Sequence, residues 1–434
     1  MALEIEAAEL AAHCRDCDAI VAALPPRPAR TAAEAAAAEA AKRDARDARA
    51  RFLRRRAGEV YSILTHDRTQ PLRADELVYA ASDRFPGLAP SRAAVEAERQ
   101  HPQRDKEGVE IDQGILLCHI LSSRTAGLHL VHTMLRPTRA AEQLLARFRA
   151  DGAIDLGPVR VERVGKAGHV TLTNPSFLNA EDDSTVAPLE TAVDLVLLDP
   201  DLEVGVLRGG VVSHPKYAGR RVFNAGINLT HLYHGKISFV GFFLIRDLGF
   251  VHKLYRGLTT ELFVPDEPEL TVEKPWIAAV EAFAIGGGCQ LLLTMDHVLA
   301  EDDSYFNLPA RKEGIIPGAA NLRLGRAVGD RLARQAILYE RGFPAASPEG
   351  ALLCDEVVPR GGMDAAIERA VTRLTSAGLV SAAANRKALR IAEEPLDVFR
   401  RYMALYAREQ ADCHFSPALI RNLEQNWDAK RRAP

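Results

Sequence analysis

The sequence predicts an α/β protein whose core lies between two helical parts. Three observations lead to this prediction: helical periodicity over the first ~150 residues, a period-two alternation of apolar and polar residues from about Asp151, and a return to helical periodicity after Pro359. Strands interspersed with helices are typical of α/β layers. We expect a helical accessory domain over residues 1–155, an α/β core over 156–360 and a helical region over 361–434.

The first part is predicted to be helical from its composition. Alanine occupies eleven of the nineteen positions from Ala32 to Ala50, with glutamates early and basic residues late in the segment. Alanine has the highest helix propensity, and this order of charges complements the helix dipole. A second stretch, Ile115 to Leu135, is rich in apolar residues and contains three histidines. Histidines in such faces are more often packed core residues than ligands, so no chemistry is assigned to this part.

Strands are predicted where the alternation is clearest. Residues 159–164 and 169–173 place apolar side chains at every second position, the period of a half-buried strand. The further strand candidates are residues 193–198, 205–207, 236–240, 276–283 and 298–301.

Composition argues against several classes of protein. The 434 residues include 55 basic and 58 acidic side chains, a net charge of −3, so the chain as a whole does not attract nucleic acid. The best apolar run, residues 239–245, has seven residues, whereas a membrane span needs roughly 18–20. The first ten residues carry three glutamates instead of the positive charge of a secretory signal, so we expect a cytoplasmic protein.

The cysteines do not indicate disulfides or a metal. Six cysteines scattered over this length do not make a disulfide framework. Cys14 and Cys17 form one C-x-x-C beside His13, but zinc sites usually need a second pair of ligands, and this region offers none. An ordinary helical surface is the favoured interpretation, and no metal ligand is assigned.

The common catalytic signatures are missing. The sequence contains no G-x-S-x-G, no G-x-x-x-x-G-K-[ST], no G-x-G-x-x-G and no H-E-x-x-H. His231 and His234 lie close together, but no nearby carboxylate completes a two-histidine iron site. A solvated loop is the favoured interpretation of that pair.

Two turns that contain glycine stand out instead. Residues 284–290 read Ala-Ile-Gly-Gly-Gly-Cys-Gln between a strand candidate and a helical run, which permits close backbone approach and leaves N–H groups pointing outward. A second such turn lies at residues 223–228. Two converging N–H groups would stabilise a thioester carbonyl as it becomes an enolate, each by roughly 3–4 kcal/mol. Tight strand–helix packing explains the three glycines equally well.

Four motifs, in order along the chain, resemble those of the crotonase (enoyl-CoA hydratase/isomerase) superfamily. Residues 174–180 are similar to its N-R-P-x-x-x-N-A-L element and 225–229 to its A-G-A-D-I loop. Residues 275–290 are similar to its K-P-x-I-A-A-V-x-G-x-A-x-G-G-G-x-E segment, and 314–320 to its G-x-x-P-G-A-G-G element. The resemblance covers Leu156 to about Pro359 and implies a crotonase-type ββα spiral core, with a helical N-terminal domain and C-terminal helices around it.

The resemblance implies an acyl-CoA substrate and an oxyanion hole made of the backbone N–H groups of Ile227 and Gly287. Both glutamates that a hydratase uses are absent: Gln290 ends the G-G-G-x-E motif, and Ala310 replaces the glutamate of P-E-x-x-x-G. An amide does not titrate and a methyl group accepts no proton, so we do not expect ordinary hydration.

One branch of the superfamily combines this core with a helical N-terminal extension and a glutamine at the same place. It contains the cofactor-independent aryl-acetyl-CoA dioxygenases of dihydroxyphenylglycine and glycopeptide (vancomycin-type) antibiotic biosynthesis. The sequence resembles this branch, which implies conversion of (3,5-dihydroxyphenyl)acetyl-CoA and O2 to the arylglyoxylate and CoA through a carbanion. Such an anion reduces oxygen itself, so neither metal nor flavin is expected. Residues 239–245 are a candidate for a dry oxygen pocket, although a plain buried segment explains them at least as well.

The resemblance places Glu181, Arg246 and Gln290 around the aryl group. Each of the first two has an alternative interpretation: Glu181 precedes two aspartates, as in a solvated turn, and Arg246 precedes Asp247, as in a structural ion pair. His214, Lys216 and Arg220 are candidates for binding the CoA phosphates, and ordinary surface charge explains them equally well.

Two other functions stay open. The alternative enzyme is a crotonase-like acyl-CoA thioesterase, decarboxylase or isomerase with Glu181 as its base. The alternative that is not an enzyme is a non-catalytic relative that binds RNA or a partner protein. The sequence shows no concentrated basic face of the kind that RNA binding needs. Family cores assemble as trimers or pairs of trimers, so the resemblance implies a homotrimer or homohexamer, without a nucleic-acid or membrane partner.

Overall fold

The computed structural model describes residues 2–259 and 270–432. Backbone contacts divide the chain into two compact units. Unit 1 comprises residues 1–134, 230–244 and 396–434, and unit 2 comprises residues 135–229 and 245–395. Unit 1 is helical, whereas unit 2 contains every strand found in the described residues.

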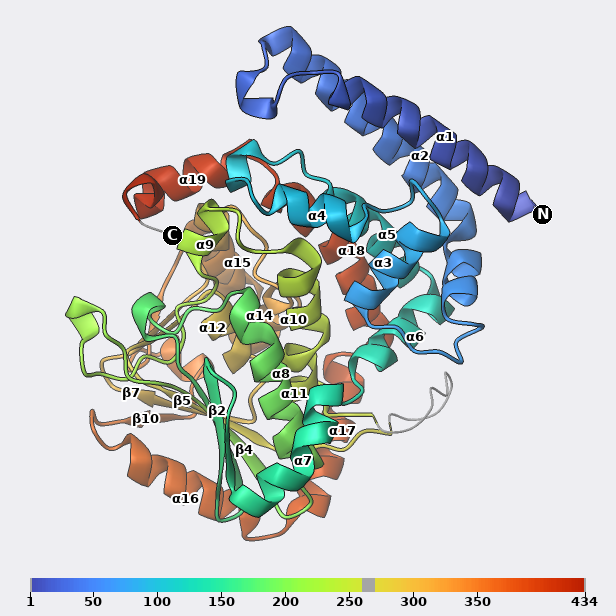
Figure 1. Ribbon diagram of the computed structural model, residues 1–434. Helices are drawn as coiled ribbons and strands as arrows, with labels where there is room; N and C mark the ends of the chain where they lie inside the picture. The colour runs from blue at the N-terminus through green and yellow to red at the C-terminus, as the bar shows by residue number, and fades with distance from the viewer. Residues whose placement is uncertain (1, 260–269, 433–434) are drawn as a thin grey trace. The chain divides into compact units, whose positions relative to one another are not determined.

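Unit 1 begins with a hairpin of two long helices, α1 (Ala2–Ala22) and α2 (Ala32–Leu64), which lie side by side (Figure 1). Helix α2 starts with a reciprocal cap at Thr31. The Glu34 N–H donates to the Thr31 hydroxyl at 3.3 Å, and the Thr31 N–H donates to the Glu34 carboxylate at 2.8 Å. The helix predicted from the alanine-rich composition is therefore confirmed.

The centre of unit 1 is the pair α5 (Glu110–Ser122) and α18 (Leu396–His414). A Cβ on Gly114 of α5 would lie 2.6 Å from the Ala407 carbonyl oxygen and 2.8 Å from the Ala411 Cβ. Glycine at this position lets the two helices approach closely. The other helices wholly within unit 1 are α3 (Ala74–Arg84), α4 (Arg92–Glu98), α6 (Arg124–Met134) and α19 (Pro417–Trp427).

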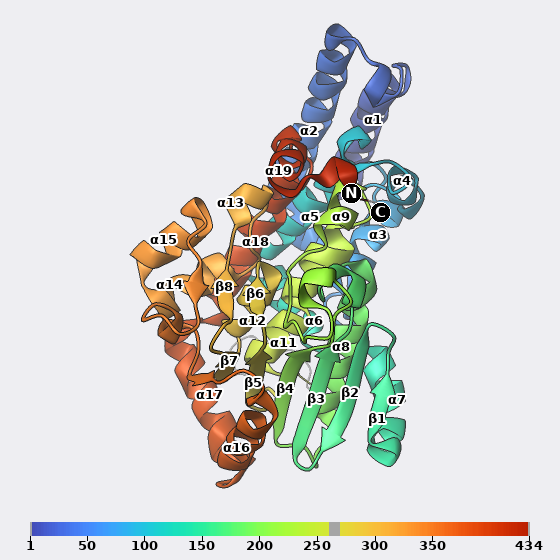
Figure 2. The ribbon, with the colours of Figure 1, turned by 90° about the vertical axis from the view of Figure 1, so that its left-hand side faces the viewer.

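Unit 2 is built on a seven-stranded sheet with the order β1-β2-β3-β4-β5-β7-β10 (Figure 2). Strands β1, β2 and β3 pair antiparallel, and the pairs from β3 to β10 are parallel. The strands are β1 (Ala153–Asp155), β2 (Val159–Val164), β3 (Ala167–Leu172), β4 (Val204–Gly209), β5 (Trp276–Val280), β7 (His297–Glu301) and β10 (Glu356–Val358).

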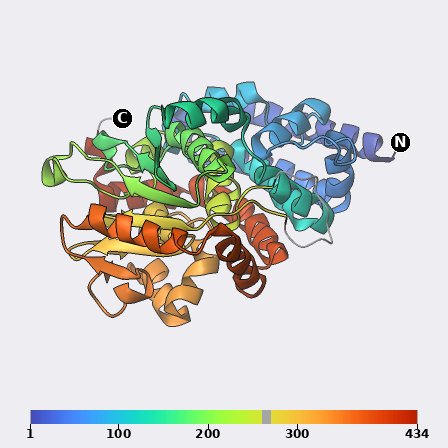
Figure 3. The ribbon, with the colours of Figure 1, turned by 90° about the horizontal axis from the view of Figure 1, so that it is seen from below.

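Helices cover both faces of this sheet (Figure 3). On one face, Leu207 and Ala278 belong to the main core with α8 (Asp183–Leu198) and α11 (Phe250–Arg256). On the other face, their neighbours Val206 and Ile277 belong to a second core with α16 (Met363–Thr375). Successive side chains of a strand point to opposite faces, so the central strands are apolar on both.

A second sheet, with the order β6-β8-β9, leads into the region of the candidate site. Its strands are β6 (Phe283–Ile285), β8 (Tyr305–Asn307) and β9 (Phe343–Pro344). Strand β6 is followed by α12 (Gly287–Leu292), and β8 by α13 (Ala310–Glu313). The other helices of unit 2 are α7 (Arg139–Asp151), α10 (Ile245–Leu248), α14 (Ala320–Val328), α15 (Asp330–Tyr339) and α17 (Leu379–Glu393).

Most of the predicted strands are confirmed, and two are wrong. Residues 276–283 form two strands instead of one, because Ala282 between them has a φ of +64°. Residues 193–198 are the end of helix α8, whose buried apolar run cannot be distinguished from a buried strand by periodicity. Residues 236–240 contain no strand, and the last two of them begin a π-helical segment, Phe239–Leu244.

The boundaries between the two compact units differ from the boundaries of the predicted domains. Helix α7 belongs to unit 2, because Ala141 and Phe148 pack into the main core against the sheet. Helices α16 and α17 also belong to unit 2, so only the last part of the predicted C-terminal region joins unit 1. The helical character of both ends is confirmed, and the predicted boundaries stay a prediction.

In the part of the chain that the structure describes, no single helix has the length and apolar character needed to cross a membrane. One bent pair, over residues 110–122 and 124–151, passes that test by length and composition alone.

Candidate active site

Two glycine turns of unit 2 lie against each other. Gly226 and Gly286 have positive φ angles of +80° and +53°. A Cβ on Gly226 would lie 2.8 Å from the Ile285 carbonyl oxygen and 3.0 Å from the Gly287 nitrogen. The Ile285 N–H also donates to the Asn224 carbonyl oxygen at 3.0 Å. Glycine at position 226 therefore lets the two turns meet backbone to backbone.

These turns present two N–H groups that have no acceptor. The Glu181 N–H donates to the Gly226 carbonyl and the Asn228 N–H to the Glu181 carbonyl, both at 2.7 Å, which holds the turn around Ile227. Gly287 is the first residue of α12, where N–H groups have no partner within the helix. Among the described residues, no hydrogen bond uses the N–H of Ile227 or Gly287. Such a pair can bind a carbonyl oxygen that gains negative charge.

Four buried side chains form a continuous set of hydrogen bonds beside Gly287, here named the polar chain: Glu181, Arg246, Gln290 and Asp247. The Nε and Nη2 atoms of Arg246 donate to the two Glu181 carboxylate oxygens at 2.7 and 2.8 Å. Nη1 of Arg246 donates to the Gln290 side-chain oxygen, and Nε2 of Gln290 donates to Oδ1 of Asp247. The four side chains are therefore linked end to end.

The polar chain brings together the three residues that the resemblance places around an aryl group. Glu181 is 0% exposed, so it does not lie in a solvated turn. Arg246 pairs with Glu181 at 2.7 Å, whereas its distance to Asp247 is 3.8 Å, so the Arg–Asp pair is the weaker contact. The solvated-turn interpretation of Glu181 is therefore wrong, whereas a structural ion pair remains an interpretation of Arg246, and the roles of both residues toward a substrate stay predictions.

Two glycines make room for the polar chain. A Cβ on Gly287 would lie 3.0 Å from Nη2 of Arg246 and 3.3 Å from Oε1 of Glu181. Nη2 of Arg246 also donates to the Gly287 carbonyl oxygen at 3.2 Å. Gly318 has a φ of +47°, and a Cβ there would overlap the Gln290 amide and the Asp247 carboxylate. The polar chain thus contacts the same residue whose N–H is without an acceptor.

Two supporting residues are not among the sequence-based candidates. Nδ2 of Asn224 donates to Oε1 of Glu181 at 2.9 Å, and its Oδ1 accepts from the Gly226 N–H at 2.6 Å. Asp247 accepts a second hydrogen bond, from the Ala319 N–H at 3.2 Å. Burial raises the pKa of Asp247, against the opposite effect of the Arg246 charge. The signal for Asn224 in the sequence is its position two residues before the turn glycine.

A further carboxyl group, Glu313, lies at the Gly286 turn and is also absent from the sequence-based candidates. Its Oε2 and Oε1 atoms are 3.7 and 4.0 Å from the point that a Cβ on Gly286 would occupy. Burial raises the pKa of Glu313 to about 8, while the neighbouring Lys312 charge lowers it. The site therefore contains a partly buried carboxyl group whose pKa is raised toward neutral pH.

The three residues predicted for CoA phosphates do not belong to the polar chain. Arg220 pairs with Glu301 at 2.6 Å and with Asp303, so its charge is already compensated. Nδ1 of His214 accepts from the Lys216 N–H at 3.2 Å, and the Lys216 ammonium lies 5.1 Å from the Tyr217 ring centre. Their contact with a phosphate stays a prediction.

The apolar run 239–245 is divided between the two units, because Ile245 begins unit 2. Within unit 1, the rings of Phe239 and Phe243 pack against His414, with centre-to-centre distances of 6.4 and 5.2 Å. Burial lowers the pKa of His414 to about 3, so this ring is neutral and packs as an apolar group. Burial of residues 239–245 agrees with a dry oxygen pocket and equally with a plain buried segment, so the oxygen pocket stays a prediction.

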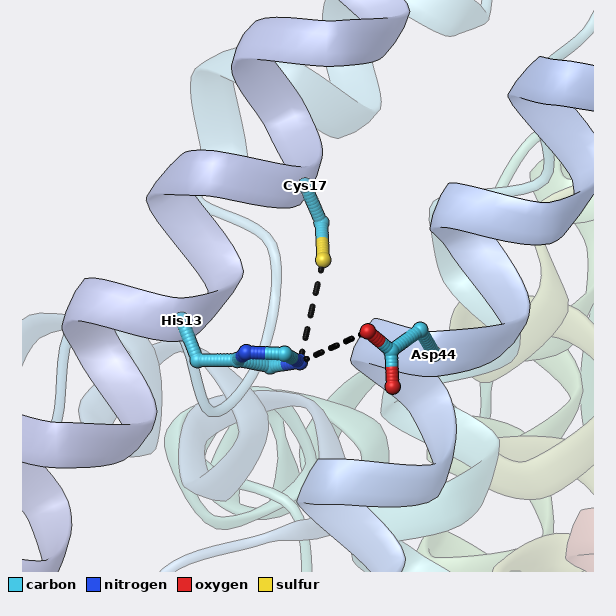
Figure 4. Close-up of side chains that lie close together, drawn as sticks. All are labelled: His13, Cys17 and Asp44. Atoms are coloured by element: carbon cyan, nitrogen blue, oxygen red, sulfur yellow. Dashed lines mark hydrogen bonds and ion pairs between the residues drawn. The ribbon is translucent and has the colours of Figure 1, made fainter.

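The residues around the single C-x-x-C motif form a small cluster on α1 and α2 (Figure 4). Nε2 of His13 lies 3.8 Å from Sγ of Cys17 and 3.2 Å from Oδ2 of Asp44, and the side chains of His13 and Asp44 are 40% and 55% exposed. Asp44 comes from α2, so the cluster joins the two helices of the hairpin. Structural zinc sites use four protein ligands, and this group of three is best described as a polar contact between the helices.

Comparison with known proteins identifies the family. Residues 165–405 match the family described as enoyl-CoA hydratase/isomerase. The chain is 53% identical over 355 residues to the (3,5-dihydroxyphenyl)acetyl-CoA 1,2-dioxygenase of Amycolatopsis orientalis, which covers 82% of this chain and 80% of that protein. It is 29% identical over 231 residues to a probable enoyl-CoA hydratase of Mycobacterium bovis, which covers 53% of this chain and 79% of that protein.

The fold agrees with this family. The structure matches the crystal structure of an enoyl-CoA hydratase from Mycobacterium avium subsp. paratuberculosis with a TM-score of 0.51 and 22% identity, over 62% of this chain and 98% of the other. Residues 165–405, which match the family, include the two glycine turns and Gln290. The chain therefore belongs to the enoyl-CoA hydratase/isomerase family, the crotonase superfamily.

Proposed function

We propose that this protein is a cofactor-independent dioxygenase that converts (3,5-dihydroxyphenyl)acetyl-CoA and O2 to (3,5-dihydroxyphenyl)glyoxylate and CoA. Its 53% identity to the Amycolatopsis enzyme, over 80% of that protein, supports the reaction class. The structural observation behind the proposal is that the N–H groups of Ile227 and Gly287, without acceptors, lie next to a buried polar chain that contains Gln290.

The two N–H groups support the first step, loss of a proton from the α carbon. In the proposed complex the thioester oxygen accepts a hydrogen bond from each of them. The charge on this oxygen grows as the α C–H bond breaks, so the hydrogen bonds strengthen toward the transition state. Fixed donors of this kind typically contribute roughly 3–4 kcal/mol each.

The second step needs no resident metal or flavin in this proposal. The carbanion, delocalised into the dihydroxyphenyl ring, transfers an electron to O2, and the two radicals combine to a peroxide at the α carbon. The peroxide attacks the thioester carbonyl, the C–S bond breaks, and the thiolate leaves. The second α C–H bond then breaks, its proton is lost, and its electron pair forms the keto C=O bond as the O–O bond breaks. One oxygen atom of O2 becomes the keto oxygen and the other enters the carboxylate, so the atoms balance.

The polar chain supports recognition of the two phenol groups. Arg246 and Glu181 are held by charge-assisted hydrogen bonds at 2.7 and 2.8 Å, which fixes their orientation before substrate binds. In the proposed complex a phenol hydroxyl meets donors and acceptors that do not have to reorganise. This is the property that makes a buried polar group selective for a hydroxylated ring.

The alternative function, a thioesterase, decarboxylase or isomerase with Glu181 as base, is less well supported. Both Glu181 oxygens accept from Arg246, and Oε1 also accepts from Asn224 at 2.9 Å. Removal of a substrate proton by this carboxylate would first require one of these three hydrogen bonds to break.

An oxygen-dependence experiment tests the proposal. The protein is incubated with (3,5-dihydroxyphenyl)acetyl-CoA in air and under strict anaerobic conditions, and free CoA is measured with a thiol reagent. We expect CoA release only with oxygen, and ¹⁸O2 is expected to label both the keto group and the carboxylate. Release of CoA at the same rate without oxygen contradicts the proposal and supports a thioesterase.

The proposal extends to assembly and biological role. We expect a homotrimer or homohexamer, which light scattering on the purified protein measures. The product class, an arylglyoxylate, fits the biosynthesis of dihydroxyphenylglycine for glycopeptide antibiotics, and a cytoplasmic location fits its CoA ester substrate.

A further inference from the structure

We propose that Glu313 is the general base that removes the α proton of the bound thioester. This inference rests on the proposed function, because it assigns a residue to the first step of that reaction.

The position of Glu313 is the first argument. A Cβ atom on Gly286 would lie 3.7 Å from Oε2 of Glu313 and 3.7 Å from the Cα atom of Gly226. The carboxylate therefore lies beside the Gly286 turn, one residue before Gly287. In an enolising thioester, the carbon that loses its proton is separated from the carbonyl oxygen by only one atom. A base for that carbon has to lie close to the oxyanion hole, and Glu313 lies beside the turn that leads into Gly287.

The second argument is that the other acidic groups near the turns are engaged. Both Glu181 oxygens are bound to Arg246, and Asp247 accepts from Gln290 and from the Ala319 N–H. Asp182 accepts from the Ser184 N–H at 3.0 Å and hydroxyl at 2.6 Å. By contrast, within the described chain no hydrogen bond or ion pair reaches the Glu313 carboxylate. Its lone pairs are available to a proton of the substrate.

The third argument is the local structure of α13. Residues 310 and 313 are three apart on this helix, so both side chains lie on the same face. Ala310 is buried and has no proton acceptor, and Glu313 places a carboxylate one turn further along. On the outer side, Arg311 and Lys312 pair with Glu340 at 3.4 and 3.6 Å, which orients the helix with Glu313 toward the Gly286 turn.

The ionisation of Glu313 suits a base. Burial raises its pKa to about 8 and the Lys312 charge opposes this, and a base is most effective when its pKa lies near the working pH. The Gly286 turn carries no charged side chain. Helix α15, which packs against α13, carries Asp330, Arg331 and Arg334, and none of them contributes to this pKa. In the step itself the C–H bond breaks, the proton moves to a Glu313 oxygen, and the electron pair passes into the carbonyl held by the two N–H groups.

The test uses isotope exchange, which reports proton removal without oxygen. Wild-type protein and the Glu313→Gln variant are incubated anaerobically with (3,5-dihydroxyphenyl)acetyl-CoA in D2O, and deuterium at the α carbon is followed by mass spectrometry. We expect exchange to fall by about 10²–10⁴-fold in the variant, the usual contribution of a general base. Glu356→Gln, in an exposed pair with Arg369, is the matched control and is expected to exchange like wild type.

A second variant keeps the inference testable if Glu313→Gln does not fold. The wild-type rate is expected to rise with pH through about 8 as Glu313 becomes a carboxylate. Lys312→Met removes the charge that lowers this pKa, so the midpoint of the rising limb should move to higher pH, whatever the change in the maximum rate. If the rising limb of the pH–rate profile does not move in Lys312→Met, the assignment of Glu313 is contradicted. An exchange rate of Glu313→Gln within threefold of the wild-type rate also contradicts it. If a variant gives one of these contradicting results while the wild-type protein still needs oxygen for turnover, only the assignment of Glu313 is wrong. If the wild-type protein turns over without oxygen, the proposed function is wrong.

Discussion

Arg246 and Glu181 form a buried two-point ion pair, in which Nε and Nη2 of the guanidinium bind the two carboxylate oxygens at 2.7 and 2.8 Å. Neither side chain is more than 4% exposed. The remaining contacts of Arg246 reach Gln290 and the Gly287 carbonyl oxygen, so a single side chain connects the ion pair to the start of α12. Changes to this pair are therefore expected to alter both stability and the geometry of the site.

The first prediction concerns the cost of separating this pair. Glu181→Leu should lower the free energy of unfolding by about 3–5 kcal/mol, because it leaves the Arg246 charge buried without its partner. Urea denaturation followed by circular dichroism measures this loss. The double variant Glu181→Leu with Arg246→Met should recover most of the stability but no turnover. A double variant as unstable as the single one contradicts this explanation.

The second prediction concerns Gly287. An added Cβ would lie 3.0 Å from Nη2 of Arg246 and 3.3 Å from Oε1 of Glu181, so Gly287→Ala has to displace the polar chain or the turn. We expect turnover to fall by more than tenfold, the size of effect seen when one oxyanion donor is lost. Gly58→Ala is the matched control, because a Cβ on Gly58 in helix α2 meets nothing within 4 Å. That change should leave turnover intact and raise stability by about 0.5–1 kcal/mol.

The two glycine turns could be predicted from the sequence, whereas the supporting contacts could not. A strand followed by three glycines and a helix is a local pattern, and β6, Gly286 and α12 follow it. The Asn224 side chain bound to Glu181 joins residues 43 positions apart, and no local pattern reveals such a pair. The same holds for Glu313, which only the folded chain brings to Gly286.

The wrong strand at residues 193–198 has a different cause. Helix α8 is buried on nearly all sides, so its sequence lacks the polar face that distinguishes a helix by periodicity. Asp194 and Glu190 in this helix bind Lys253 at 2.8 and 2.7 Å, which compensates charges that would otherwise be costly inside the core. Without knowledge of that partner, an apolar run of this length is as compatible with a strand as with a helix.

The third prediction follows from Gln290. Gln290→Glu would place a second carboxyl group against Asp247, where the amide now donates a hydrogen bond. Repulsion by Asp247 and burial would raise the pKa of the new group in the folded state above its unfolded value of roughly 4.3, against the opposite effect of the Arg246 charge. A raised pKa favours the folded state at low pH, so the variant's stability should fall as pH rises above roughly 4.3. Urea denaturation at pH 5 and pH 8 measures this; an equal difference from wild type at both pH values contradicts it.

The fourth prediction concerns metal. Because the proposed reaction uses a carbanion that reduces oxygen directly, exhaustive dialysis against a chelator should leave turnover unchanged. His13→Ala removes the centre of the cluster with Cys17 and Asp44, the group most similar to a metal site among the described residues, and should also leave turnover unchanged. Loss of turnover on dialysis that only added iron restores would contradict both the prediction and the proposed chemistry.

The last prediction tests Glu313 through stability alone. In the unfolded chain its carboxyl titrates at roughly 4.3, whereas burial raises the folded pKa to about 8. Between these values the folded state binds the proton that the unfolded state releases, so this group contributes a loss of stability as pH rises from roughly 4.3 to 8. Glu313→Gln cannot titrate and should avoid that loss. Relative to wild type, its free energy of unfolding should increase steadily over this range and stay level above about pH 8, as urea denaturation at a series of pH values measures. A difference that does not change with pH would mean that the Glu313 carboxyl is well solvated, which would also remove the physical reason for its suitability as a base near neutral pH.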